Sequence, residues 1–79
     1  RTTIALVGHT DAEGGAEGNM AISLSRADAA RQVLIDAYGI DPDRVETHGV
    51  GFFSPVAPND TEAGREANRR VEVVITSTQ

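Results

Sequence analysis

Several residue types are absent or scarce in this sequence, and each absence argues against a class of protein. The 79 residues include no cysteine, so a disulfide scaffold or a cysteine-based metal site is excluded. No lysine is present, and seven arginines against twelve acids give a formal net charge of −5, which argues against electrostatic binding of nucleic acid. No apolar run approaches the ~20 residues of a membrane-spanning helix. Stability must come from packing, although a chain this short buries only ~60% of the surface of its unfolded form.

The apolar pattern predicts one domain over residues 1–79 with the element order β-α-β-α-β. The expected elements are a buried strand over residues 2–8, a helix from Met20 to Tyr38 with Asn19 as N-cap and Gly39 as its end, a short strand from Arg44 to Gly49, a loop from Phe52 to Asp60, a short helix from Thr61 to about Ala67, and a strand from Arg70 to Thr76. In the last strand, Val71, Val73 and Ile75 are expected to face inward. This order is typical of an α/β sandwich with helices on one face of a small mixed sheet.

The first strand ends in an aspartate, Asp11, that enters a glycine-rich loop. The helix expected to pack on this strand carries Arg26 in an otherwise apolar line, where a guanidinium must either reach water or find an anion. Two interpretations of these residues stay open. One is a structural Asp11–Arg26 ion pair. The other is a divided site in which Asp11 takes an ammonium group and Arg26 takes a carboxylate, as suits the zwitterionic end of an amino acid.

The combined pattern resembles the OmpA-like peptidoglycan-binding domain of OmpA C-terminal regions, the peptidoglycan-associated lipoprotein and MotB-type stator proteins. The residues that carry the resemblance are Gly8, His9, Thr10, Asp11, Gly14, Asn19, Ile22-Ser23, Arg26-Ala27, Gly39-Ile40, Arg44, Gly49, Gly51, Pro55, Asn59, Thr61, Gly64-Arg65 and Asn68 to Glu72. Ile22 stands where leucine is usual in that family. The family domain usually begins with a further strand and helix, so we expect an N-terminally truncated domain whose sheet exposes an edge.

The resemblance implies non-covalent binding of peptidoglycan in the periplasm or an equivalent envelope space, without catalysis, metal or cofactor. Asp11 and Arg26 align with the family residues that hold the ammonium and carboxylate at the free end of diaminopimelate in the stem peptide. Thr10, Asn19 and Arg69 are expected to contribute further ligand contacts. Lysine-type walls lack the side-chain carboxylate and are expected to bind poorly. The domain would anchor an envelope protein to the wall.

The alternatives to wall binding are an enzyme, a metal site and an interaction module. His9 and Asp11 form a His-x-Asp pattern, but the other histidine, His48, lies far along the chain, and no serine has a nucleophile context. His9 is therefore expected to satisfy a buried hydrogen bond at the strand end. An interaction module of the same fold, including a homodimer, would have little reason to keep both Asp11 and Arg26.

Two further groups have more than one interpretation. Arg65, Arg69 and Arg70 could pair with neighbouring acids, touch the glycan or fix the last strand, and the structural role is favoured for Arg65 and Arg70. Phe52 and Phe53 are expected to pack under their loop, with a partner-binding tip as the alternative.

Overall fold

The computed structural model describes residues 2–77, and the ends of the predicted domain, residues 1, 78 and 79, lie outside this range. The elements in chain order are strand β1 (Thr3–Gly8), helix α1 (Ala16–Tyr38), the 3-10 turn η1 (Pro42–Arg44), strand β2 (Val45–Gly49), helix α2 (Glu62–Asn68) and strand β3 (Val71–Ser77). The predicted element order is confirmed. Within residues 2–77, no helix is both long and apolar enough to cross a bilayer.

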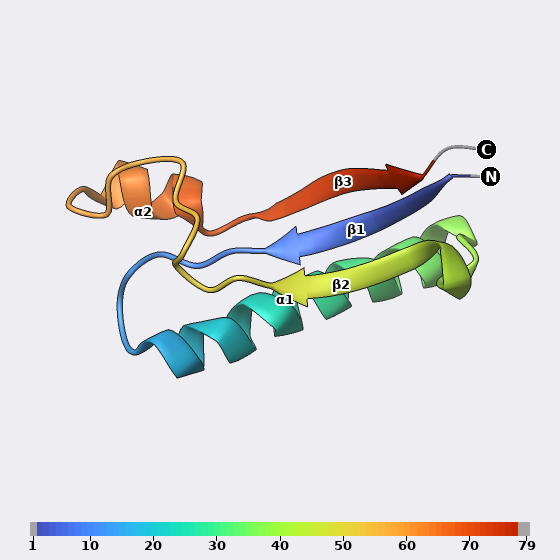
Figure 1. Ribbon diagram of the computed structural model, residues 1–79, viewed down its shortest axis with the longest axis horizontal. Helices are drawn as coiled ribbons and strands as arrows, with labels where there is room; N and C mark the ends of the chain where they lie inside the picture. Colours follow the sequence, from blue (N-terminus) through green and yellow to red (C-terminus); the bar gives the residue numbers. More distant parts are fainter. Residues whose placement is uncertain (1, 78–79) are drawn as a thin grey trace.

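The three strands form one mixed sheet in the order β2-β1-β3 (Figure 1). Strand β1 pairs parallel with β2 and antiparallel with β3. A parallel neighbour needs a crossover connection, and α1 supplies it between β1 and β2. Strand β1 is the central strand, and Ala5 and Leu6 of its apolar run Ile4–Val7 are buried. The fold is the predicted α/β class.

Helix α1 covers β1 and β2 and forms the core with them (Figure 1). Leu6, Ala27 and Val45 are buried at the centre, one from each of these three elements. Two glycines allow the backbones to approach closely. A Cβ atom on Gly8 would lie 1.9 Å from the carbonyl oxygen of Ser23, and one on Gly49 would lie 2.5 Å from the backbone nitrogen of Leu24. The second turn of α1 is thus held against the strand ends that precede the candidate site.

Helix α1 begins earlier than the sequence predicted. Its first residue is Ala16 and its N-cap is Gly15, so the prediction of Asn19 as N-cap is wrong. An N-cap side chain accepts a hydrogen bond from a backbone N–H, whereas the amide of Asn19 donates to two carbonyl groups from inside the first turn. The predicted end at Gly39 is confirmed, with φ +66° and a backbone N–H that bonds Ile35 O.

Helix α2 lies beyond the ends of β1 and β2, next to the start of β3 (Figure 1). Its predicted cap is confirmed, because Thr61 Oγ1 accepts the backbone N–H of Gly64 at 3.0 Å. The register pairs Val73 with Leu6 and Ile75 with Ile4, so these valine and isoleucine side chains point to the α1 side of the sheet, as predicted. Both are nevertheless 64% exposed, because α1 runs under β1 and β2 and hardly reaches β3.

Candidate functional site

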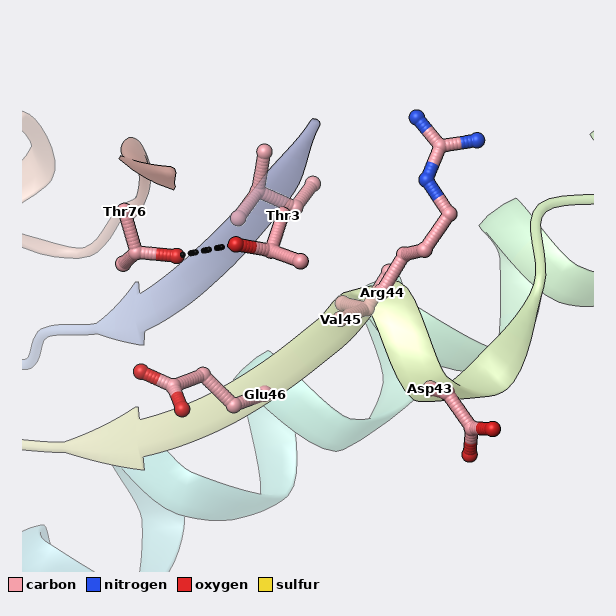
Figure 2. A pocket seen from close by; sticks show the side chains of 7 residues that line it. Thr3, Asp43, Arg44, Val45, Glu46 and Thr76 are labelled. Atoms are coloured by element: carbon pink, nitrogen blue, oxygen red, sulfur yellow. Dashed lines mark hydrogen bonds between the residues drawn. The ribbon is translucent and has the colours of Figure 1, made fainter. Parts of the chain in front are cut away.

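A pocket of about 200 Å³ lies at the end of the sheet where β1 and β2 begin (Figure 2). Its charged side chains diverge: Figure 2 shows the Arg44 head group pointing away from the carboxylates of Asp43 and Glu46. None of the predicted site residues lines this pocket. A ligand site needs converging polar groups, so we locate the candidate site at the opposite end of the sheet, where β1 leads into the glycine-rich loop.

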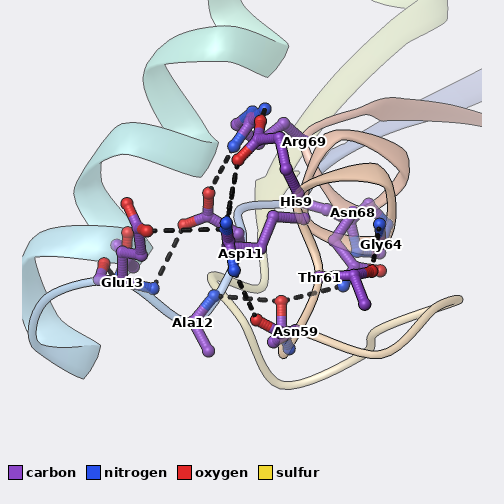
Figure 3. Close-up of polar contacts among 12 residues, drawn as sticks. His9, Asp11, Ala12, Glu13, Asn59, Thr61, Gly64, Asn68 and Arg69 are labelled. Carbon is purple, nitrogen blue, oxygen red and sulfur yellow. Dashed lines mark hydrogen bonds and ion pairs between the residues drawn. The ribbon is translucent and has the colours of Figure 1, made fainter.

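Asp11 is the centre of a polar cluster at that opposite end (Figure 3). Asp11 is buried, with 7% of its surface exposed. Arg69 Nη1 donates to Asp11 Oδ2 at 2.6 Å, and the backbone N–H of Glu13 donates to Asp11 Oδ1 at 3.1 Å. The second Arg69 head-group nitrogen, Nη2, donates to Glu62 Oε1 at 2.7 Å. One guanidinium therefore joins the acid of the loop to an acid of α2.

The cluster continues as an alternating series of charges. Arg65 Nη2 lies 3.1 Å from Glu62 Oε2, and Arg65 Nε lies 3.5 Å from Glu13 Oε1. The hydrogen bond from Arg69, opposed by burial, lowers the pKa of Asp11 below its ordinary value. Hydrogen bonds from Arg69 and then Arg65 lower the pKa of Glu62, and those to Glu62 and Asp11 raise that of Arg69. Both acids are therefore ionised at neutral pH.

Arg26 lies at the same strand end but makes a different contact. Its Nη1 donates to the carbonyl oxygen of His9 at 3.1 Å, two residues before Asp11. Within residues 2–77, Arg26 forms no ion pair, so the structural Asp11–Arg26 pair considered from the sequence is absent. Arg65, Arg69 and Arg70 each pair with an acid instead. Arg26 is thus a half-buried guanidinium at this strand end that has no carboxylate partner among the described residues.

Thr10 and His9, which precede Asp11 in the chain, carry buried polar side-chain atoms. Thr10 Oγ1 is buried and has no hydrogen-bond partner among the described residues. His9 Nε2 lies 3.0 Å from Glu72 Oε1, although neither ring nitrogen has a partner in hydrogen-bonding geometry. Burial, and after it the charge of Arg70, lowers the pKa of His9 although the nearby Glu72 carboxylate opposes this, so the ring is neutral at pH 7. The backbone N–H of His9 donates to Arg70 O at 2.8 Å.

Asn19 shapes the glycine-rich loop. It is buried, and its Nδ2 donates to Glu13 O at 2.7 Å and to Gly15 O at 3.0 Å. Gly14 between these carbonyls has φ +87°, a conformation that favours glycine. Asn19 therefore holds the loop beside the candidate site.

Three residues of the cluster were missed by sequence reasoning as parts of the site. Glu62 holds Arg69, and Asn59 Oδ1 accepts both the backbone N–H of Ala12 and the side-chain amide of Asn68. Asn68 is fully buried, and its Oδ1 also accepts the backbone N–H groups of residues 56 and 57. Asn59 and Asn68 belong to the family pattern, and this was the one sign in the sequence that they matter. Their spacing does not reveal that they join the glycine-rich loop to the loop before α2.

The structural roles expected of two arginines are present, whereas one of the two phenylalanines differs from its prediction. Arg70 pairs with Glu72 and donates to Ser54 O, and Arg65 pairs with acids, as favoured from the sequence. Phe52 is half-buried, but Phe53 is 66% exposed, so the prediction that both pack under the loop is wrong for Phe53.

No cluster of three or more histidine, aspartate or glutamate side chains suited to a metal ion occurs in the described part of the chain.

The comparisons with known proteins identify the family of this chain. The sequence matches the OmpA family over residues 1–69. The chain belongs to the OmpA family. Among its OmpA-family relatives, the probable lipoprotein YiaD of Escherichia coli is 40% identical over 75 residues, which are 95% of this chain and 34% of that protein. The peptidoglycan-binding protein ArfA of Mycobacterium bovis is 38% identical over 72 residues, 91% of this chain and 22% of that protein.

The fold of this OmpA-family chain also matches solved structures. The crystal structure of the peptidoglycan-associated lipoprotein from Burkholderia pseudomallei superposes with a TM-score of 0.89 at 33% identity, over 95% of this chain and 63% of that one. The chain thus spans about a third or less of the length of the two relatives named above. Further relatives are named outer membrane protein or outer-membrane lipoprotein, which agrees with the envelope location expected from the sequence.

Proposed function

We propose that this domain binds peptidoglycan non-covalently through the diaminopimelate residue of the stem peptide, and so anchors an envelope protein to the cell wall. Arg26 would hold the carboxylate at the free end of diaminopimelate, and Asp11 would accept its ammonium group. Thr10 and Asn19 would complete the site, and Arg69 would orient Asp11. The role is one of binding, without a covalent step.

The observation that carries the proposal is the state of Arg26. Its guanidinium is half-buried at the end of β1, anchored by one hydrogen bond to His9 O, and has no carboxylate partner among the described residues. A guanidinium has five N–H donors, so most of its donor capacity is left for a ligand. A carboxylate is the ligand group that best matches two parallel N–H donors.

Asp11 is prepared for a cation although it already has two partners. An ionised carboxylate has about four acceptor positions, and Arg69 Nη1 and the Glu13 backbone N–H use two of them. These contacts hold the carboxylate ionised and fixed in orientation. Thr10 Oγ1 adds a buried hydroxyl without a partner within residues 2–77, as expected of a group that bonds a ligand.

The relatives support the same ligand class. ArfA is named a peptidoglycan-binding protein, and the Burkholderia lipoprotein is named peptidoglycan-associated. An interaction module that has lost wall binding is the alternative function. We favour wall binding because Arg26 retains a free donor set at the strand end that also positions Asp11.

The test is a calorimetric titration of a diaminopimelate-containing stem peptide into the wild-type chain and into Arg26→Ala, with a circular-dichroism melt of both. We expect the variant to stay folded and to lose at least about tenfold in affinity, because a charge-assisted bidentate pair is removed. Arg31→Ala is the matched control, since Arg31 lies on the same helix but donates to Val45 O and Pro42 O away from the site. A wild-type chain that folds without binding the stem would contradict the proposal.

The diaminopimelate assignment has its own test. A stem with lysine in place of diaminopimelate keeps the ammonium and lacks the side-chain carboxylate, so it should compete poorly. The difference between the two stems should shrink in Arg26→Ala, because the residue that reads the carboxylate is gone. Equal competition by both stems in the wild-type chain would leave peptidoglycan binding possible and reject the role of diaminopimelate.

A further inference from the structure

Phe53 is exposed to solvent beside the candidate site. Its residue is 66% exposed, in a chain with only three aromatic residues. Its ring lies 4.8 Å, centroid to centroid, from the ring of half-buried Phe52, and the two planes are inclined by 42°. Phe52 thus packs against one side of the Phe53 ring. Because Phe53 is exposed, it contributes little to the core, and an exposed aromatic ring of this kind is a candidate contact for a ligand.

The backbone that carries Phe53 is fixed at several points. The N–H of Thr10 donates to Gly51 O at 2.8 Å, and the N–H of Gly51 donates to the buried Ser23 Oγ at 2.9 Å. The N–H of Phe53 closes a turn onto Val50 O at 3.2 Å, and Arg70 Nη2 donates to Ser54 O at 3.1 Å. The segment is therefore joined to β1, α1 and the start of β3. A ring on a fixed backbone loses little conformational freedom when a ligand covers it.

We propose that Phe53 provides a stacking surface for an amino sugar of the glycan strand, next to the site for the stem peptide. The proposal rests on the proposed function, which it extends from the peptide to the sugar. The C–H bonds on one face of a pyranose ring are weakly positive, and they pack favourably on the negative face of an aromatic ring.

The charge of the segment favours a sugar over other occupants. Residues 49–59 carry no charged side chain, in a chain where acids and arginines make up 24% of residues. No side chain of this segment could form an ion pair with a charged peptide surface or a phospholipid head group. An N-acetylated sugar is uncharged, and so is the muramic acid unit once its carboxyl group is joined to the stem peptide.

The distances also suit a sugar. Phe53 lies two residues from Gly51, whose carbonyl bonds Thr10, so its backbone is within about 7 Å of that contact. The diaminopimelate residue is the third of the stem, so the chain that joins it to the sugar is short, on the order of 10 Å when extended. A stem held at Asp11 and Arg26 can therefore bring the sugar to which it is attached within reach of Phe53.

The experiment compares two ligands on the same proteins. One is a diaminopimelate stem peptide, and the other is the same stem attached to its disaccharide. In the wild-type chain we expect the disaccharide form to bind about three- to tenfold more tightly than the free stem. Phe53→Ala should remove this advantage and leave the affinity for the free stem unchanged, and Phe53→Trp should retain the advantage. Val56→Ala is the control, since Val56 is an apolar residue of the same loop and 63% exposed.

The outcomes separate the two proposals. Equal affinity of the two ligands for the wild-type chain, an equal loss for both in Phe53→Ala, or the same effect in Val56→Ala would overturn the sugar contact. If the free stem does not bind but the disaccharide form binds through Phe53, the sugar contact stands and the diaminopimelate site is wrong. If neither ligand binds, both proposals are wrong.

Discussion

Asp11 has its charge balanced within the protein before any ligand arrives. A buried carboxylate is costly unless it is paired and hydrogen-bonded, and Arg69 and the Glu13 backbone supply both conditions. Glu62 in turn holds Arg69 from the other side. The result is a carboxylate with a fixed orientation, which a ligand ammonium can approach without first ordering it.

This pairing predicts how stability depends on pH. The pKa of Asp11 in the folded chain lies below its ordinary value of 3.8, so on acidification the unfolded chain binds the proton first. The stabilisation by the Asp11–Arg69 pair is thus complete above about pH 4 and declines as the pH falls further. We expect Asp11→Asn to be less stable than the wild type at pH 7 and the difference to shrink below pH 3.8. Urea unfolding of both proteins at pH 7 and below pH 3.8 measures this difference in the free energy of unfolding.

A control variant tests whether the effect belongs to this pair. Asp60→Asn removes an exposed carboxylate from the loop before α2. Its stability relative to the wild type should change little between the two pH values. A gap between Asp11→Asn and the wild type that stays constant down to pH 3 would contradict the role given to the ion pair.

At this scale, the sequence predicted which side chains gather at the strand end but not how they pair. Asp11 and Arg26 follow from the strand end and from a charge in an apolar line, and Thr10 follows from the family resemblance. That Arg69, 58 positions away, is the partner of Asp11 depends on how the antiparallel strand β3 returns beside β1. Side-chain spacing within one segment carries no information about such a pairing.

At the scale of elements, the position of α1 depends on glycines in the strands beneath it. Gly8 and Gly49 end the two parallel strands, and at both positions a side chain would collide with backbone atoms of the helix. A collision with backbone cannot be relieved by a rotamer change. The close approach brings Arg26, on the next turn of α1, within hydrogen-bonding distance of the strand end.

Gly8→Ala should therefore destabilise the fold. The added methyl would lie 1.9 Å from Ser23 O, so helix and sheet must separate, and we expect a loss of about 1–3 kcal/mol in the free energy of unfolding. Gly18→Ala is the matched control: the residue is inside α1, and beyond its chain neighbours and the backbone of its own helix no atom lies within 4 Å of the added methyl. Alanine there should stabilise by about 0.5–1 kcal/mol. Chemical denaturation measures both, and equal effects of the two substitutions would contradict this account.

The element order was predictable because each strand and helix has a strong local pattern. The cap at Thr61 and the end at Gly39 agree with the structure. The start of α1 was predicted incorrectly because Gly18 disfavours a helix locally. Packing on the sheet and the two bonds from Asn19 outweigh that local preference.

At the scale of the whole molecule, the sheet is covered unevenly. Helix α1 lies under β1 and β2, whereas β3 is an edge strand with little beneath it. Val73 and Ile75 are each 64% exposed on the α1 side, and Val74 is 44% exposed on the other. An exposed apolar edge strand offers both unpaired backbone groups and apolar side chains to another chain.

We expect this 79-residue chain to self-associate through β3 as its concentration rises, because pairing would cover the apolar side chains and the free edge together. Sedimentation velocity across a concentration series measures this. Val73→Lys should shift the chain toward monomer, since a charge on the edge opposes pairing. Val33→Lys is the control, because Val33 is an exposed valine, 56% accessible, on α1. If the wild-type chain stays monomeric throughout, or if both lysine variants act alike, the exposed edge of β3 is not the surface that drives association.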